Sequence, residues 1–198
     1  MTTADIRGTE GRIPAPTRSR AVAWTRAAFV VALIAVGGSL YLSLGMGRKA
    51  CALCFYQRAF ALSLVAVLGM GLAARSGFSG RLSLLALPLA AAGLGVALFH
   101  VSLEVRDKLE CPPGIFGWGT APQQSVAVFA VLFLLLLAGA WWELRNGAVS
   151  WPALVGALVL GGLMAVASSI ANPPPPPAPP QAYKEPIPDI CRPPFRPQ

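Results

Sequence analysis

The sequence predicts an all-α membrane protein, with a four-helix transmembrane bundle, a fifth transmembrane helix and a proline-rich C-terminal tail. Composition and the arrangement of apolar residues both predict this class. Hydrophobic residues make up 55% of the 198 residues and charged residues only 12%, and the mean hydropathy is +0.61. A soluble core of this size cannot use so much apolar surface, so a lipid bilayer is the expected solvent.

Five apolar runs justify five membrane-spanning helices, each of which needs about 20 residues to cross the hydrocarbon core. The first run carries no charged residue. The second run is short between its flanking arginines and reaches span length if its helix begins near Cys51. Tryptophans at the start of the fifth run and just before it are typical of a membrane interface. In chain order, the runs are 27–47, 59–74, 82–103, about 124–142 and 151–171.

The basic residues predict the orientation. The net charge of +8 is spread over short segments between the apolar runs, which suits lipid headgroups and gives no reason to expect a nucleic-acid partner. The segment before the first run carries Arg7, Arg12, Arg18, Arg20 and Arg26. Because such segments stay in the cytoplasm, we predict a basic cytoplasmic N-terminal segment over 1–23, a transmembrane domain over 24–171 and a proline-rich outer-face tail over 172–198.

The four cysteines, Cys51, Cys54, Cys111 and Cys191, all lie outside the middle of the runs. Five crossings place all four on the outer face, which is the oxidising side in a bacterium. An even number of cysteines there indicates disulfides, and three pairings are possible. A proline-rich tail extends by about 3.1 Å per residue, enough to bring Cys191 back across the outer face to Cys111. We therefore expect a paired or reactive Cys191.

The octet CALCFYQR, residues 51–58, places two thiols and a cation on one helical face. Cys51 and Cys54 are three residues apart and Cys54 and Arg58 are four apart, spacings that bring side chains together on a helix. The helix N-terminus and the Arg58 cation both stabilise a thiolate, which is the nucleophilic form of cysteine. The octet therefore has the parts of a redox-active dithiol.

A structural disulfide and a metal site are the two other interpretations of the octet. A structural disulfide gives no reason for an arginine that faces a membrane interior, where a charge without a partner is costly. A structural zinc site needs four Cys or His ligands, and only His100, Cys111 and Cys191 are available to complete it. We favour the redox dithiol and assign no metal.

The octet, of the form Cys-x-Leu-Cys-x-Tyr-x-Arg at the start of a transmembrane helix, resembles the disulfide bond formation protein B (DsbB) family of membrane thiol–quinone oxidoreductases. The segment ALFHVSLE, ahead of the loop that carries Cys111, resembles the third helix and second outer loop of that family. The likeness covers roughly residues 24–145. It implies that Cys51 and Cys54 form the disulfide next to a bound quinone, and that Arg58 supports the quinone and the thiolate.

The chain departs from the family in the position of its second cysteine pair. The family usually has four spans, with that pair inside the second outer loop. This chain has only Cys111 there and carries Cys191 after a fifth span. We expect the second pair to be reassembled as Cys111–Cys191 through the tail.

The expected function is that of a protein-disulfide:quinone oxidoreductase in the bacterial inner membrane. It reoxidises a DsbA-like periplasmic thiol oxidase of thioredoxin fold and passes the electrons to a membrane quinone, ubiquinone or menaquinone. The expected catalytic residues are Cys51, Cys54, Cys111 and Cys191, and the expected quinone-binding residues are Arg58 and His100. His100 can hydrogen-bond a quinone carbonyl or move a proton; alternatively, it is an interfacial histidine satisfied by backbone or a headgroup.

Two rival functions are compatible with these residues. One is a non-enzymatic membrane assembly or metal-handling protein whose structural disulfides resist reduction. The other is an enzyme that carries reducing equivalents outward. That enzyme would ordinarily need thiols on both sides of the membrane, and the sequence predicts none on the cytoplasmic side.

Overall fold

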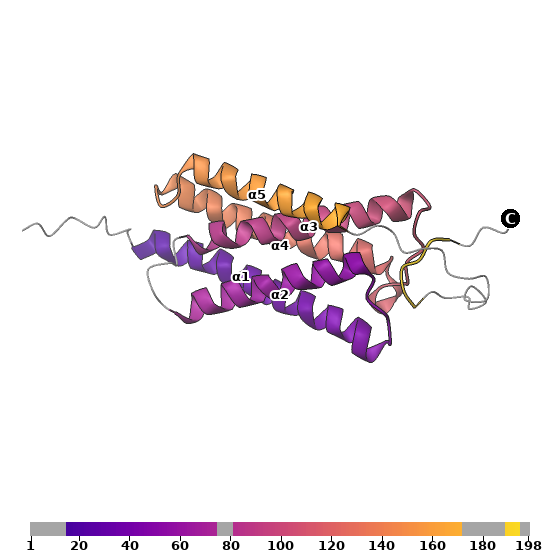
Figure 1. Ribbon diagram of the computed structural model, residues 1–198. Helices are drawn as coiled ribbons and strands as arrows, with labels where there is room; N and C mark the ends of the chain where they lie inside the picture. The colour runs from indigo at the N-terminus through magenta and orange to yellow at the C-terminus, as the bar shows by residue number, and fades with distance from the viewer. Residues whose placement is uncertain (1–14, 75–80, 172–188, 195–198) are drawn as a thin grey trace, which may run out of the picture.

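Long helices account for most of the described chain (Figure 1). The computed structural model describes residues 15–74, 81–171 and 189–194, with side chains from residue 22. The helices are α1 (Ala15–Leu40), continued by the π-helical turn η1 (Tyr41–Gly45), α2 (Ala52–Ala73), α3 (Leu82–Val105), the 3-10 turn η3 (Ile115–Gly117), α4 (Ala121–Arg145) and α5 (Trp151–Ile170). Five of them are long and apolar enough to cross a membrane. The described residues form no β-strand, so the predicted all-α membrane class is confirmed.

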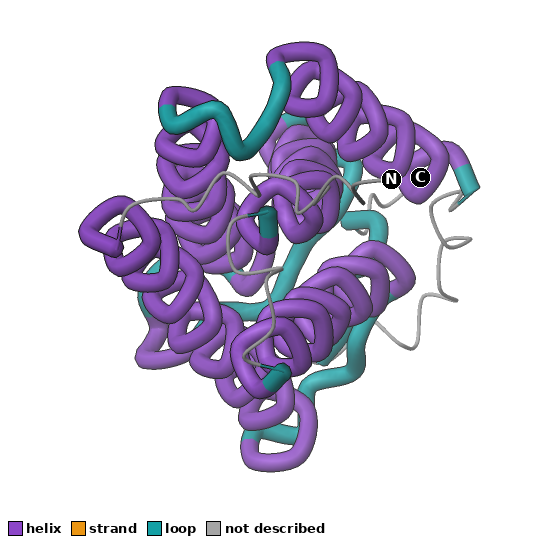
Figure 2. Tube along the Cα trace, turned by 90° about the vertical axis from the view of Figure 1, so that its left-hand side faces the viewer, coloured by secondary structure: helices purple, strands orange, loops and turns teal. Residues whose placement is uncertain are grey.

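Helix α3 lies at the centre of the bundle. It packs against α2, α4 and α5, while α1 packs against α2 and α4. Figure 2, seen almost along the helices, shows them gathered into one bundle. Small residues permit this close approach. A Cβ atom on Gly93 of α3 would collide with the Phe129 ring of α4, and one on Gly161 of α5 would collide with the Pro88 backbone of α3. Helix α5 packs mainly against α3, so it lies at one side of the bundle that α1, α2, α3 and α4 form.

Two helices begin earlier than the apolar runs predict. Helix α1 begins at Ala15, inside the arginine-rich segment, because alanine and arginine favour helix and a helix need not start where hydrophobicity starts. Helix α4 begins at Ala121, where the Gln123 side chain accepts the backbone N–H of Thr120 at 3.4 Å. A proline in its first turn also suits a helix start.

Helices α1, α3 and α5 all finish at one end of the bundle (Figure 1). The four cysteines lie close together at this end. The tail segment 189–194 crosses the loops that follow α1 and α3. The backbone N–H of Lys49 donates to the Asp189 carbonyl at 2.9 Å, and Lys49 Nζ lies 2.8 Å from a carboxylate oxygen of Asp189. Glu110 and Arg192 form an antiparallel bridge with N···O distances of 2.7 and 3.0 Å. These contacts hold the tail segment against both loops.

Candidate functional site

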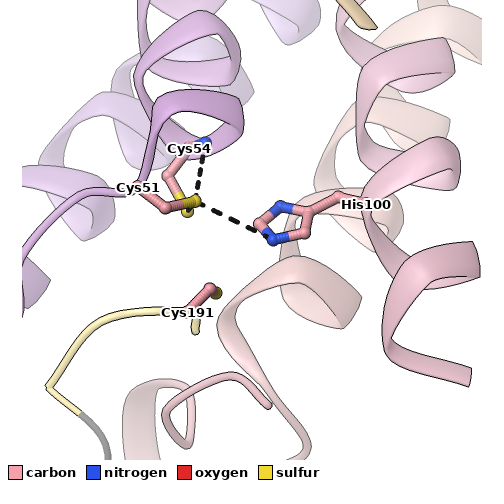
Figure 3. A group of neighbouring side chains, drawn as sticks. All are labelled: Cys51, Cys54, His100 and Cys191. Carbon is pink, nitrogen blue, oxygen red and sulfur yellow. Dashed lines mark hydrogen bonds between the residues drawn. The ribbon is translucent and has the colours of Figure 1, made fainter. Parts of the chain in front are cut away.

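Cys51 and Cys54 face each other at the start of α2 (Figure 3). Cys51 is the N-cap residue, with extended backbone (φ −70°, ψ 168°), and its Sγ accepts the backbone N–H of Cys54 at 3.3 Å. The two sulfurs are 2.9 Å apart, and both cysteines are free thiols. A sulfur at the N-cap takes the place of the usual Ser or Asp oxygen, so the helix N-terminus stabilises negative charge on Cys51.

The surroundings of Cys51 favour its thiolate. The hydrogen bond from the Cys54 thiol is the largest cause, and it lowers the pKa of Cys51 from the ordinary 9.0 to about 5. Burial opposes this shift, whereas a hydrogen bond and positive charge from His100 add to it. Because the thiolate is the form that attacks disulfides and binds metals, Cys51 is chemically reactive near neutral pH.

Cys111 and Cys191 form a disulfide. They are 80 residues apart in the chain, and their pairing is the one expected from the reach of the tail. The tail segment 189–194 and the loop after α3 enclose the bond, so that Cys111 is 8% exposed and Cys191 only 3%. The disulfide is therefore largely shielded from solvent.

His100 of α3 lies between the two cysteine pairs. Its side chain is fully buried. Its Nε2 is 3.8 Å from Cys51 Sγ and 3.5 Å from Cys111 Sγ. Its Nδ1 is 3.5 Å from the amide nitrogen of Gln57. These contacts tie His100 to sulfurs of both pairs at once.

Cys191 of the disulfide lies close to Cys51 and Cys54 (Figure 3). The sulfurs of Cys51, Cys54 and Cys191 and a ring nitrogen of His100 all lie within 4.8 Å of one another. Thiol–disulfide exchange requires a thiolate to approach a disulfide sulfur directly. Only a small movement separates these sulfurs from such an approach.

Arg58 lies one turn beyond Cys54 and is held by two serines. Its Nε donates to Ser39 Oγ at 2.9 Å, and its Nη2 donates to Ser43 Oγ at 2.6 Å and to the Ser39 carbonyl oxygen at 3.1 Å. These neutral partners offset the cost of placing a cation at the membrane edge. In the described part of the chain no carboxylate pairs with Arg58, so its positive charge is not neutralised there.

A cavity of about 210 Å³ lies beside Cys54 and Arg58. Cys191 and Gln57 also line it, so both cysteine pairs border the same space. Most of the other lining residues are apolar, and those from α1, η1, α2 and α4 include Ile34, Ala35, Leu42, Ala61, Val128 and Phe129. His100 lies outside this lining. Apolar walls with a few polar groups are typical of a small-molecule site.

Sequence reasoning missed Gln57, Ser39 and Ser43. Gln57 stands inside the octet, three residues after Cys54, a spacing that places it near the same helical face. The two serines are four residues apart near the end of an apolar run, which also places them on one face. A pair of hydroxyls at the depth of a membrane-facing arginine is the signal that identifies them as its partners.

Comparisons with known proteins agree with the geometry. A family model described as disulfide bond formation protein DsbB matches residues 20–124, a stretch that ends before α5 and Cys191. The chain is 35% identical over 111 residues to a "Probable disulfide formation protein" of Chlamydia trachomatis, a match that covers 50% of this chain and 80% of that relative. It is 29% identical over 128 residues to a "Probable disulfide formation protein C 2" of Bacillus anthracis, with 59% and 86% covered. No solved structure matches the chain.

Proposed function

Given that this chain belongs to the DsbB family, is a multi-pass membrane protein and acts in disulfide bond formation, we propose that it is a protein-disulfide:quinone oxidoreductase. It reoxidises a DsbA-like thiol oxidase and passes the electrons to a membrane quinone, ubiquinone or menaquinone. One observation carries the proposal. The sulfur of Cys191 lies within 4.8 Å of the sulfurs of Cys51 and Cys54, beside a cavity that Arg58 also lines.

Electrons enter at the outer pair, Cys111 and Cys191. A thiolate of the partner attacks their disulfide and forms a mixed disulfide with one of the two sulfurs. The second thiol of the partner then displaces that sulfur. The partner leaves as a disulfide, and Cys111 and Cys191 become thiols that have taken up its two electrons and two protons.

The next exchange moves these electrons to an oxidised Cys51–Cys54 pair. The Cys191 thiolate attacks that disulfide, and Cys111 resolves the mixed disulfide, so the outer bond is restored. An intact Cys111–Cys191 bond beside two free thiols, as in the structure, corresponds to the end of this exchange. The position of His100 Nε2, near a sulfur of each pair, supports a role in supplying a proton to the leaving sulfur.

The residues around the cavity fit the head group of a quinone. Apolar walls suit a flat ring, and N–H donors on Arg58 and Gln57 suit its carbonyl oxygens. The cavity volume of about 210 Å³ is smaller than the roughly 300–1,000 Å³ of sites that enclose a drug-sized ligand. This size suits the single ring of a quinone, with the hydrocarbon chain of the quinone left in the lipid. A quinone bound there would accept two electrons and two protons from the reduced Cys51–Cys54 pair. Arg58, which lines the same cavity as Cys54, would stabilise negative charge that develops on the quinone ring.

We assign the site to the periplasmic face of the inner membrane, with residues 1–23 in the cytoplasm, the transmembrane domain over 24–171 and the tail over 172–198 outside. The arginine-rich N-terminal segment supports this orientation. The positive charges of Arg48 and Lys49 argue for the reverse orientation, but the five N-terminal arginines outweigh them. Lys49 also forms an ion pair with Asp189.

The test is anaerobic quinone reduction by the full-length protein in lipid nanodiscs, supplied with a reduced thioredoxin-fold partner. We expect one quinone to be reduced for each partner disulfide formed, and none without the partner. If neither the partner nor a small dithiol drives quinone reduction, the cysteines are structural and the proposal is wrong. Electron flow from quinol to an oxidised partner would instead support the outward-reducing rival.

A further inference from the structure

The side chains that surround the exchange point also form the ligand set of a closed metal site. The sulfurs of Cys51, Cys54 and Cys191 and a ring nitrogen of His100 lie within 4.8 Å of one another. Three thiolates and one imidazole are a common ligand set of structural zinc sites. We propose that the fully reduced protein binds a thiophilic divalent cation, with Zn²⁺ as the type, through these four side chains. The bound cation and the disulfides exclude each other, whatever quinone or partner the protein uses.

The distances require only small adjustments. In a tetrahedral site with Zn–S of about 2.3 Å and Zn–N of about 2.0 Å, neighbouring ligand atoms lie about 3.5–3.8 Å apart. Cys51 Sγ and His100 Nε2 are already 3.8 Å apart. The sulfurs of Cys51 and Cys54, at 2.9 Å, must separate by about 1 Å. Rotations about the Cα–Cβ bonds of the cysteines supply movements of this size.

The surroundings of the ligands suit a structural metal. Cys51, His100 and Cys191 are buried, and they come from the start of α2, from α3 and from the tail segment. A cation there would tie the tail to the bundle without the disulfide. Gln57 lies 3.5 Å from His100 Nδ1, where metal-binding histidines normally have a hydrogen-bonding partner. With its amide oxygen turned to an Nδ1–H, Gln57 leaves the Nε2 lone pair for the metal.

Binding requires prior reduction of the outer disulfide. In the structure Cys191 is bonded to Cys111, and a sulfur ligand must be a thiolate. A phosphine reductant supplies two electrons, water supplies two protons, and the disulfide becomes two thiols. The cation then displaces the thiol protons of Cys51, Cys54 and Cys191 and binds the neutral imidazole of His100. Cys111 keeps its proton and is not a ligand.

Cobalt(II) is the probe, because its visible absorption is intense in a tetrahedral thiolate site and weak in an octahedral one. We expect the fully reduced protein, kept anaerobic, to take up one equivalent of Co²⁺ with intense bands that Zn²⁺ abolishes. Protein with the Cys111–Cys191 bond intact and Cys51 and Cys54 reduced should bind at least about tenfold more weakly. This comparison involves no substitution. Equal binding by the two redox states would overturn the proposal.

Two cysteine variants form a matched pair. Cys111→Ser frees Cys191 without a reductant acting on the outer bond, so it should bind Co²⁺ as tightly as the fully reduced protein. Cys191→Ser frees Cys111 but removes a ligand, so it should bind at least about tenfold more weakly, as should His100→Gln. Equal affinities of the two cysteine variants, or undiminished binding by His100→Gln, would contradict the assigned ligands.

Discussion

The guanidinium of Arg58 keeps its full positive charge because its partners are neutral. The hydroxyls of Ser39 and Ser43 and one backbone carbonyl fix its position. This cation lies at the wall of a cavity that Cys54 also lines. It would therefore attract negative charge on a molecule bound in that cavity. An arginine paired with a carboxylate would attract such charge more weakly, because the carboxylate would cancel most of its electric field.

The first prediction tests this residue. Arg58→Met should raise the apparent KM for quinone and slow turnover. We expect kcat/KM to fall by about 10- to 100-fold, since a hydrogen bond to a charged group contributes about 1.5–3 kcal/mol. Steady-state quinone reduction by the inserted, folded variant measures it. Ser39→Ala/Ser43→Ala is the matched control, because it keeps the charge and removes its anchors, so its loss should be smaller. Unchanged quinone kinetics in Arg58→Met would be evidence against the assigned role.

The second prediction concerns the acidity of Cys51. With a pKa of about 5, this thiol should ionise as the pH rises through that value and be protonated below it. In reduced Cys111→Ser/Cys191→Ser protein, the ultraviolet absorbance of the thiolate should therefore rise with a midpoint near that pH. Cys54→Ala in the same background should move the midpoint upward, because the Cys54 hydrogen bond is the largest cause of the shift. A first midpoint close to the ordinary 9.0 would contradict the interpretation.

At the scale of elements, the tail segment 189–194 connects the loops that follow α1 and α3. It is held by the backbone bridge between Glu110 and Arg192, by the disulfide and by Lys49 with Asp189. The ion pair is exposed, at 72% and 42%, and such pairs contribute at most about 1 kcal/mol. The disulfide is thus the main bond between this segment and the bundle. Its reduction should loosen the segment. In the proposed reaction, Cys191 is then free to move between the protein partner and the inner pair, Cys51 and Cys54.

The third prediction follows for the tail. Cys191→Ser should abolish oxidation of the protein partner, because the outer pair receives the electrons first. A small dithiol that reaches Cys51 and Cys54 directly should still drive quinone reduction. Cys111→Ser should behave in the same way, and the double variant should be no worse than either single one, since the pair acts as a unit. Loss of the partner's free thiols measures oxidation of the partner, and quinone absorbance measures quinone reduction. Normal partner oxidation by Cys191→Ser would show that the inner pair meets its partner unaided.

At the scale of the whole molecule, the four cysteines lie at one end of the bundle, whereas basic residues lie at both ends. Arg81 and Arg145 stand at the end of the bundle away from the cysteines, and Arg81 donates to the Ala148 carbonyl there at 3.1 Å. Because positive charge stands at both ends, the proposed cytoplasmic N-terminus rests on the larger number of arginines ahead of the first span. In the proposed orientation, the cysteine end faces the oxidising compartment, where a disulfide persists.

The fourth prediction tests this orientation. In a variant without the native cysteines, a cysteine introduced at Ser19 should be protected from an impermeant thiol reagent in intact cells. One introduced at Gln198 should be labelled, because five spans place the two ends on opposite sides. Permeabilised cells, in which both positions should react, are the control. Labelling at Ser19, or protection at Gln198, in intact cells would contradict the predicted five-span topology.

The sequence by itself determined the features that depend on near neighbours. Hydrophobic runs identify helices able to cross a membrane, because the bilayer imposes length and apolarity on each segment separately. The spacing of Cys51, Cys54 and Arg58 places them on one face, because three- and four-residue spacings have the same consequence in every α-helix. The apolar runs predict later starts for α1 and α4 than the structure has, because a helix can extend beyond its apolar residues.

Only the tertiary structure decided how distant segments meet. The reach of the tail allowed Cys111 and Cys191 to pair, but the seating of the tail between two loops brings Cys191 within 4.8 Å of the inner pair. The place of His100 between the pairs depends on how α3 packs against α2. These contacts depend on which helices approach closely, and small residues such as Gly93, opposite the Phe129 ring, permit that approach. Packing of this kind joins residues far apart in the chain, so no local pattern records it.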